Sequence, residues 1–182
     1  MFDDIPYLLG QLLGIAAVTF GFISFQKKTG GGIIFWQMAT ALAFSFHYLL
    51  IGALTGAAIN ALAAVKGVFY YIRDKKGSNS PVIPIIFSVI FTVTTFLTWN
   101  GWYSIFILIG VLINALAFAF LPPQKVRYCM LVKAPITLLY NVFVFSVGGI
   151  VYETIVFISS VIGIIRFRNK DDAFTKKEVS AK

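Results

Sequence analysis

The strongest constraint on this chain is a series of seven apolar segments separated by short connectors. The segments lie at about residues 5–25, 32–51, 57–73, 82–98, 103–121, 127–146 and 150–167. A helix needs roughly 20 apolar residues to cross a bilayer core about 30 Å thick, and every connector contains Gly, Pro, Asn or Ser, which end helices. The sequence therefore predicts an all-α membrane protein with seven transmembrane helices.

Composition excludes a soluble domain. Of the 182 residues, 59% are hydrophobic and 12% are charged, whereas a soluble domain has about 25% charged residues. The net charge of +8 would suit nucleic acid only if the basic residues gathered on one soluble face or tail. They do not, so we expect a lipid bilayer as the partner and no nucleic acid.

The basic residues indicate the orientation of the chain, because Lys and Arg accumulate in cytoplasmic loops. Thirteen of the 15 basic residues fall on alternate connectors or the C-terminal end. They are Lys27, Lys28, Arg73, Lys75, Lys76, Lys125, Arg127, Arg166, Arg168, Lys170, Lys176, Lys177 and Lys182. This separation predicts an outside N-terminus and a cytoplasmic C-terminus, and the mixed-charge residues 170–182 are expected to form a disordered cytoplasmic tail. The acidic opening MFDDIPY does not fit a signal peptide, so the first segment is expected to remain as a span.

Two sets of landmarks indicate an internal repeat. Gly56 lies four residues before Asn60, which lies thirteen before Arg73; Gly149 lies four before Glu153, which lies thirteen before Arg166. A gapless match of residues 54–73 onto 147–166 aligns these positions. We therefore expect a three-plus-one-plus-three architecture: a first three-helix repeat over residues 1–76, a loop and linker helix over 77–101, and a second repeat over 102–169.

Several strings resemble a known family. The Pro123-Gln124 dipeptide at a helix end, the two triplets and the linker helix resemble the PQ-loop superfamily, which includes the SWEET sugar transporters. More closely, FHYLLIGALTGAAINAL and SVGGIVYETIVFISSVIGIIRF resemble the YgjV family of bacterial inner membrane proteins. The first repeat departs from the pattern, with Phe25-Gln26 in place of Pro-Gln. The resemblance implies a SWEET-like fold in the bacterial inner membrane.

Three charged residues lie within the apolar segments: Lys66, Lys133 and Glu153. Charge in the hydrocarbon is costly and normally faces a bundle interior or an aqueous cavity. The lysines are near enough to the basic connectors to reach water there, either as snorkelling anchors or as a basic ring at the cytoplasmic mouth of a cavity. Glu153 is too deep for that, so it is either a hydrogen-bonded packing residue or part of a substrate or proton site.

Candidate substrate-binding residues follow from the resemblance and from the repeat. Paired asparagines on the third and seventh spans of SWEET transporters contact substrate, which assigns that role to Asn60 and, with a change to an acid, to Glu153. The gapless match places His47 opposite Tyr140, so both are expected to line the same cavity, and the neighbouring Asn141 is a weaker candidate. Each of these residues also has a plain alternative as a hydrogen-bonded packing residue.

The sequence has no catalytic motif, and Cys129 and His47 have no neighbours spaced for a metal, so we expect neither an enzyme nor a metal site or cofactor. The first functional hypothesis is a small-solute transporter with a central polar cavity that opens alternately to the two sides; its partner would be a small polar solute. The alternative is a non-transporting receptor or scaffold of PQ-loop fold. Small residues four apart, such as Gly10 and Gly14, allow close helix packing or a homo-oligomer seam.

Overall fold

The computed structural model describes residues 5–26, 30–77, 80–121 and 123–180. Within these ranges the chain is helical and contains no strand. The seven helices are α1 (Ile5–Gln26), α2 (Gly30–Leu50), α3 (Leu54–Lys75), α4 (Val82–Leu97), α5 (Ser104–Phe120), α6 (Pro123–Phe143) and α7 (Val147–Ser180). They match the seven predicted segments to within a few residues at most ends, which confirms the all-α expectation.

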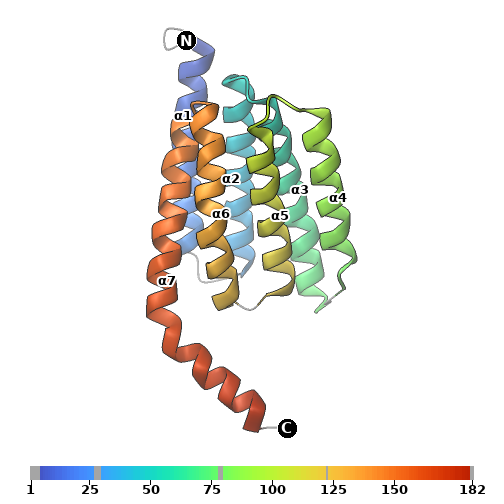
Figure 1. Ribbon diagram of the computed structural model, residues 1–182, viewed down its shortest axis with the longest axis vertical. Helices are drawn as coiled ribbons and strands as arrows, with labels where there is room; N and C mark the ends of the chain where they lie inside the picture. Colours follow the sequence, from blue (N-terminus) through green and yellow to red (C-terminus); the bar gives the residue numbers. More distant parts are fainter. Residues whose placement is uncertain (1–4, 27–29, 78–79, 122, 181–182) are drawn as a thin grey trace.

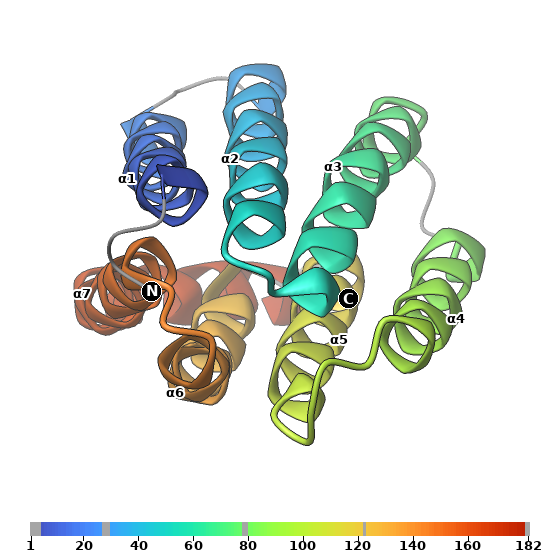
Figure 2. The same cartoon turned by 90° about the horizontal axis from the view of Figure 1, so that it is seen from above.

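The helices stand in two rows (Figures 1 and 2). Seen from above, α1, α2 and α3 form one row, α7, α6 and α5 form the other, and α4 stands beside α3 and α5 at one edge. At the other edge α1 packs directly on α7. The contact is close because it is made by glycine: a Cβ atom built on Gly148 would lie 2.7 Å from the Cα atom of Gly14.

Two turns at the same end of the bundle have the same backbone geometry. In the α2–α3 turn, the N–H groups of Ile51, Gly52 and Ala53 donate to the carbonyls of His47, Leu49 and Tyr48. In the α6–α7 turn, Val144, Phe145 and Ser146 donate to Tyr140, Val142 and Asn141. The middle residue is left-handed in both turns, with φ 79° at Gly52 and 53° at Phe145. Each donor and acceptor of the α6–α7 turn lies 93 residues after its counterpart in the α2–α3 turn. Tyr48 and Asn141, for example, are 93 residues apart.

The distribution of side chains is the reverse of that in a soluble protein. Large hydrophobic residues are exposed, with Leu97 at 81% and Ile165 at 71%. The interior holds aromatic residues together with polar ones, and His47, Lys66 and Glu153 are each less than 9% exposed. Because water would favour the opposite arrangement, this distribution is consistent with a helical protein whose outer surface faces lipid.

Length and hydropathy identify two of the described helices as candidate membrane spans, Ile5–Ser24 and Val147–Arg166. Val82–Leu97 and Ser104–Phe120 are shorter apolar helices. α3 and α6 are the helices that carry Lys66 and Lys133, and their polar residues make them the less hydrophobic ones. Crossing of the membrane by all seven helices therefore stays a prediction.

The basic connectors of the described chain gather at one end of the bundle, which we call the basic end (Figure 1). It contains the end of α3 with Arg73 and Lys75, and the start of α6 with Lys125 and Arg127. Lys27 and Lys28 lie outside the described residues. Within the expected disordered tail, residues 170–180 belong to α7, which continues as a helix to Ser180, and residues 181–182 lie outside the described residues. No Gly or Pro occurs between Arg166 and Ser180, so nothing in this stretch breaks the helix.

Candidate functional site

His47 lies at the end of α2, where three helices meet. Its Nδ1 atom is 2.7 Å from the carbonyl oxygen of Gly10 in α1, and its Nε2 atom is 2.6 Å from the Ser146 hydroxyl in the α6–α7 turn. A carbonyl only accepts, so Nδ1 carries the proton and donates it. Nε2 of the neutral ring then accepts from Ser146, whose oxygen accepts from the N–H of Gly149 at 3.0 Å. His47 thus joins α1, α2 and α7.

Tyr48 connects the two rows at their centre. Its hydroxyl donates to Oδ1 of Asn141 in α6 at 2.6 Å, and the amide nitrogen of Asn141 donates to the carbonyl of Thr137 at 3.0 Å. Tyr140, which is fully buried, packs edge-on against the Tyr48 ring. Its hydroxyl has no hydrogen-bond partner among the described residues and lies over Gly56 of α3, where a Cβ would come within 2.6 Å of it.

Nearer the middle of the bundle, an ion pair joins α6 to α7. Lys133 Nζ lies 2.5 Å from Oε1 of Glu153, and the two side chains are 12% and 5% exposed. The second carboxylate oxygen of Glu153 is buried without a hydrogen-bond partner among the described residues. A pair this deep must lose most of its hydration, so each ion depends on the other.

The second interior lysine has a different environment. Lys66 is 8% exposed, and its ammonium donates to Oδ1 of Asn114 in α5 at 2.9 Å. It also lies 5.3 Å from the ring centre of Tyr70 and 5.8 Å from that of Phe91. Lys66 therefore has an amide and two rings around its ammonium, where Lys133 has a carboxylate.

The structure brings together some of the predicted site residues and separates others. His47, Tyr140 and Asn141 lie in one cluster around Tyr48; that they line a cavity stays a prediction. Asn60 does not meet Glu153: its amide donates to the carbonyl of Gly56 in its own helix at 2.9 Å. This bond lies within α3, so it is not the interhelical packing bond that was the alternative for Asn60.

The two lysines expected at a cytoplasmic mouth both point inward. Lys133 turns to Glu153 and Lys66 to Asn114, and neither ammonium extends to the basic end. The physical reason is that each ammonium has an acceptor within the bundle, a carboxylate for Lys133 and a neutral amide for Lys66.

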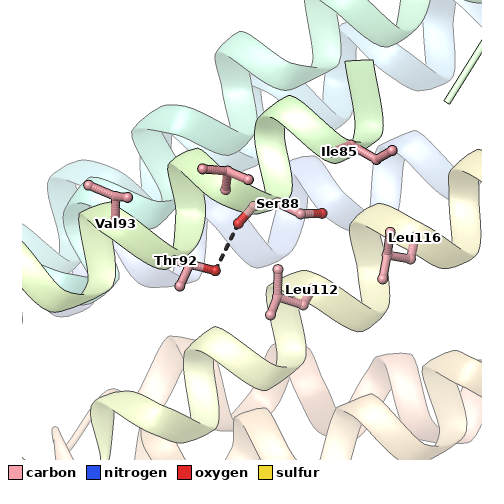
Figure 3. A pocket seen from close by; sticks show the side chains of 7 residues that line it. Ile85, Ser88, Thr92, Val93, Leu112 and Leu116 are labelled. Carbon is pink, nitrogen blue, oxygen red and sulfur yellow. Dashed lines mark hydrogen bonds between the residues drawn. The ribbon is translucent and has the colours of Figure 1, made fainter. Parts of the chain in front are cut away.

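A cavity of about 360 Å³ lies between α4 and α5, away from these residues (Figure 3). Its lining is almost wholly apolar and consists of Ile85, Ser88, Val89, Thr92, Val93, Leu112 and Leu116. The hydroxyl of Thr92 is satisfied within its helix by the carbonyl of Ser88 at 2.9 Å. None of the predicted substrate-binding residues lines this cavity, so the expected central cavity is not the one seen here.

Sequence reasoning missed Tyr48 and Ser146. A signal for Ser146 exists, since Ser directly before a helix is a preferred cap, and its oxygen accepts from the N–H of Gly149. Tyr48 stands next to His47, and the gapless match places it opposite Asn141. That alignment would have identified the pair.

Comparison with known proteins agrees with the membrane character of the chain. The family model Imp-YgjV, described as bacterial inner membrane protein, matches residues 8–171. No curated protein and no solved structure matches the chain significantly. Because the family model covers most of the sequence, the chain belongs to the YgjV family of bacterial inner membrane proteins.

Proposed function

We propose that the protein is a transporter of a small polar solute, with the site between two three-helix repeats. The observation that carries this proposal is the set of three ionisable side chains, Lys66, Lys133 and Glu153, within the bundle of an inner membrane protein. Insertion of each charge at a helix centre costs about 2.5–3.5 kcal/mol. Packing alone gives no reason to keep three of them, whereas a polar solute needs such groups on its path.

A PQ-loop or SWEET-like repeat is the second part of the proposal. It is supported by the matching turns at residues 51–53 and 144–146, which share their hydrogen bonds and a left-handed middle residue. Gly56 and Gly149 are also 93 residues apart. Gly56 packs against Tyr48 and Gly149 packs against Asn141, and these two partners are again 93 residues apart. The hydrogen bond between these two partners would then lie on the axis that relates the repeats.

Transport by such a fold would involve rocking of one repeat against the other. The described structure would be an occluded state, in which polar residues at the centre bond to one another. The seven helices would all cross the membrane, with the basic end in the cytoplasm as the positive-inside rule predicts.

A receptor or scaffold remains the second candidate, because two observations favour it. The region between the two rows is filled by aromatic residues such as Tyr48 and Tyr140, 4% and 0% exposed. The apolar cavity between α4 and α5 opens on the edge helix, where a partner helix or lipid could bind. A non-transporting membrane protein would have this filled centre and this apolar edge.

Ligand-dependent thermal stability distinguishes the two candidates. The purified protein is heated with a library of sugars, amino acids, vitamins, polyamines and organic acids, beside Asn60→Ala and the double variant Lys133→Thr/Glu153→Asn. Asn100→Ala, at an exposed connector, is the matched control. A ligand at 100 times its Kd stabilises the folded state by about 2.7 kcal/mol.

We expect a ligand that stabilises the parent and Asn100→Ala but not the double variant, and that enters liposomes containing the protein. Loss of the response in Asn60→Ala as well would place Asn60 in the site. Uptake equal to that of empty liposomes for every ligand would reject the transporter and favour the receptor or scaffold.

A further inference from the structure

The charges inside the bundle do not balance. Lys133 and Glu153 neutralise each other, whereas Lys66 has no carboxylate partner among the described residues. Its only hydrogen-bond acceptor in that part of the chain is the neutral amide of Asn114. A lysine buried to 8% exposure would normally have a counterion, because a buried unpaired charge is costly.

Both lysines lie along one face of α5. Lys66 reaches Asn114 from α3, and the Lys133 stem passes Gly110 from α6, with its Cγ atom 3.7 Å from where a Cβ of Gly110 would be. Gly110 and Asn114 are one helical turn apart, about 6 Å along the helix axis. The missing side chain at Gly110 makes room for the Thr137 hydroxyl of α6, and the Lys133 stem lies at ordinary contact distance beside it.

A row of cationic and hydroxyl groups leads from the basic end to Lys66. Arg73 donates to the carbonyl of Ala119 in α5 at 2.9 Å, and Tyr70 donates to that of Ala115 at 3.0 Å. The Tyr70 ring lies between the Arg73 guanidinium, at 5.8 Å, and the Lys66 ammonium, at 5.3 Å. Anions approaching from the basic end would therefore meet positive charge along the α3–α5 contact before they reach Lys66.

We propose that Lys66, Asn114 and Lys133 form a binding site for the anionic group of a small monoanion, a carboxylate or an inorganic ion, on the α5 face inside the bundle. The ligand supplies the one negative charge that the interior lacks. Lys66 binds the anion by charge, the Asn114 amide N–H₂ donates to it, and Lys133 contributes while it remains paired with Glu153. This inference rests on the proposed function, since it specifies the solute of the same interior.

The test is the thermal stability of the full-length protein in detergent, with acetate and lactate as organic probes and nitrate as the inorganic probe. Ionic strength is held constant with a bulky buffer sulfonate, and glycerol is a neutral comparison. We expect at least one monoanion to raise the melting temperature in a saturable manner and glycerol to have no effect. The probe that binds best distinguishes an organic from an inorganic ligand.

Variants assign the response to the site. Lys66→Met should weaken apparent affinity by about tenfold or more, because a hydrogen bond to a charged group contributes at least that much. Lys66→Arg should retain binding. Lys125→Met, at an exposed lysine of the basic end, should leave the response unchanged.

A second variant keeps the test valid if Lys66→Met does not fold. Asn114→Asp gives Lys66 a resident carboxylate in place of its present amide acceptor. We expect this protein to melt at a higher temperature without ligand and to lose the response to anions. A response that persists in both Lys66→Met and Asn114→Asp would overturn the site, and so would the absence of any monoanion effect on the parent.

Flux into liposomes separates this inference from the proposed function. Saturable, Lys66-dependent binding without uptake of the bound anion would retain the site and reject the transporter. Uptake of a neutral solute by a protein that binds no anion would reject the site and retain the transporter.

Discussion

The two three-helix units, α1–α3 and α5–α7, have similar turns and different interiors. The turns at residues 51–53 and 144–146 share one pattern of backbone hydrogen bonds. At the same separation, Thr40 and Asn60 of the first unit correspond to Lys133 and Glu153 of the second. Thr40 and Asn60 each bond to a carbonyl of their own helix, at 2.8 and 2.9 Å, whereas Lys133 and Glu153 bond to each other.

This difference indicates that the backbone arrangement of a three-helix unit does not depend on the charges in its interior. Under the proposed repeat, Thr40 and Asn60 occupy these positions in the first unit and bond within their own helices, so the shared backbone arrangement would not require an ion pair there. Charge in the second unit is therefore an addition to a frame that can be built without it, and single substitutions should reveal how far each unit depends on its own polar residues.

The largest expected effect comes from breaking the ion pair. Glu153→Asn leaves the Lys133 ammonium buried without a counterion, which costs about 3–5 kcal/mol in comparable pairs. The double variant Lys133→Thr/Glu153→Asn gives the second unit the residues of the first, and we expect it to recover most of that loss. Equilibrium unfolding in mixed detergent micelles measures both. A double variant as unstable as the single one would contradict the separability of frame and charge.

The next effect concerns the contact between the units. Tyr48→Phe removes the donor to Asn141 Oδ1 and leaves that buried oxygen unsatisfied, so we expect a loss of about 1–3 kcal/mol. Tyr140→Phe is the matched control, because the Tyr140 hydroxyl has no partner among the described residues, so it should cost less than Tyr48→Phe. The same unfolding measurement applies. Equal losses would mean that Tyr140 carries as much of the contact as Tyr48.

A smaller effect is expected at the turn of the first unit. Gly52 has φ 79°, and a Cβ there would meet nothing within 4 Å. Gly52→Ala should therefore cost only the strain of a left-handed L-residue, about 1–2 kcal/mol. A stability equal to that of the parent would show that the turn can change its backbone conformation freely.

The smallest effect is expected at the equivalent turn of the second unit. Phe145→Gly relieves the left-handed strain at φ 53° but increases the entropy of the unfolded chain, and these terms are each about 1 kcal/mol and opposite in sign. We expect a net change within about 0.5 kcal/mol by thermal unfolding. A loss above 2 kcal/mol would show that the half-exposed Phe145 ring is itself a packing contact.

Much of the helical arrangement could be predicted from the sequence because apolar length and helix-ending residues are local signals. The seven helix positions and the clustering of described basic residues at one end needed nothing more. The gapless match also placed His47 opposite Tyr140, and the structure has both beside Tyr48.

The partners of the interior polar residues could not be predicted in the same way. The gapless match aligns Glu153 with Asn60, yet each bonds elsewhere, because hydrogen bonding depends on rotamers and on the neighbouring helix. From the sequence, Lys133 could have extended to the basic end. The packing of α7 against α6 brings the Glu153 carboxylate to its ammonium instead. The helical tail after Arg166 was missed because mixed charge suits both a disordered segment and a solvated helix.

The hydrogen bond between His47 and Ser146 has a consequence for how the protein is made. The two residues are 99 positions apart, and a ribosome adds roughly 5–20 residues per second. His47 therefore leaves the ribosome many seconds before its partner, and α1 emerges earlier still, before the α7 surface on which it packs. During that interval α1 has no α7 to pack on and His47 lacks the Ser146 hydroxyl as a hydrogen-bond partner. Assembly of this protein is thus completed by its last helix, and a ribosome that stalls before α7 leaves a half-built bundle for membrane quality control.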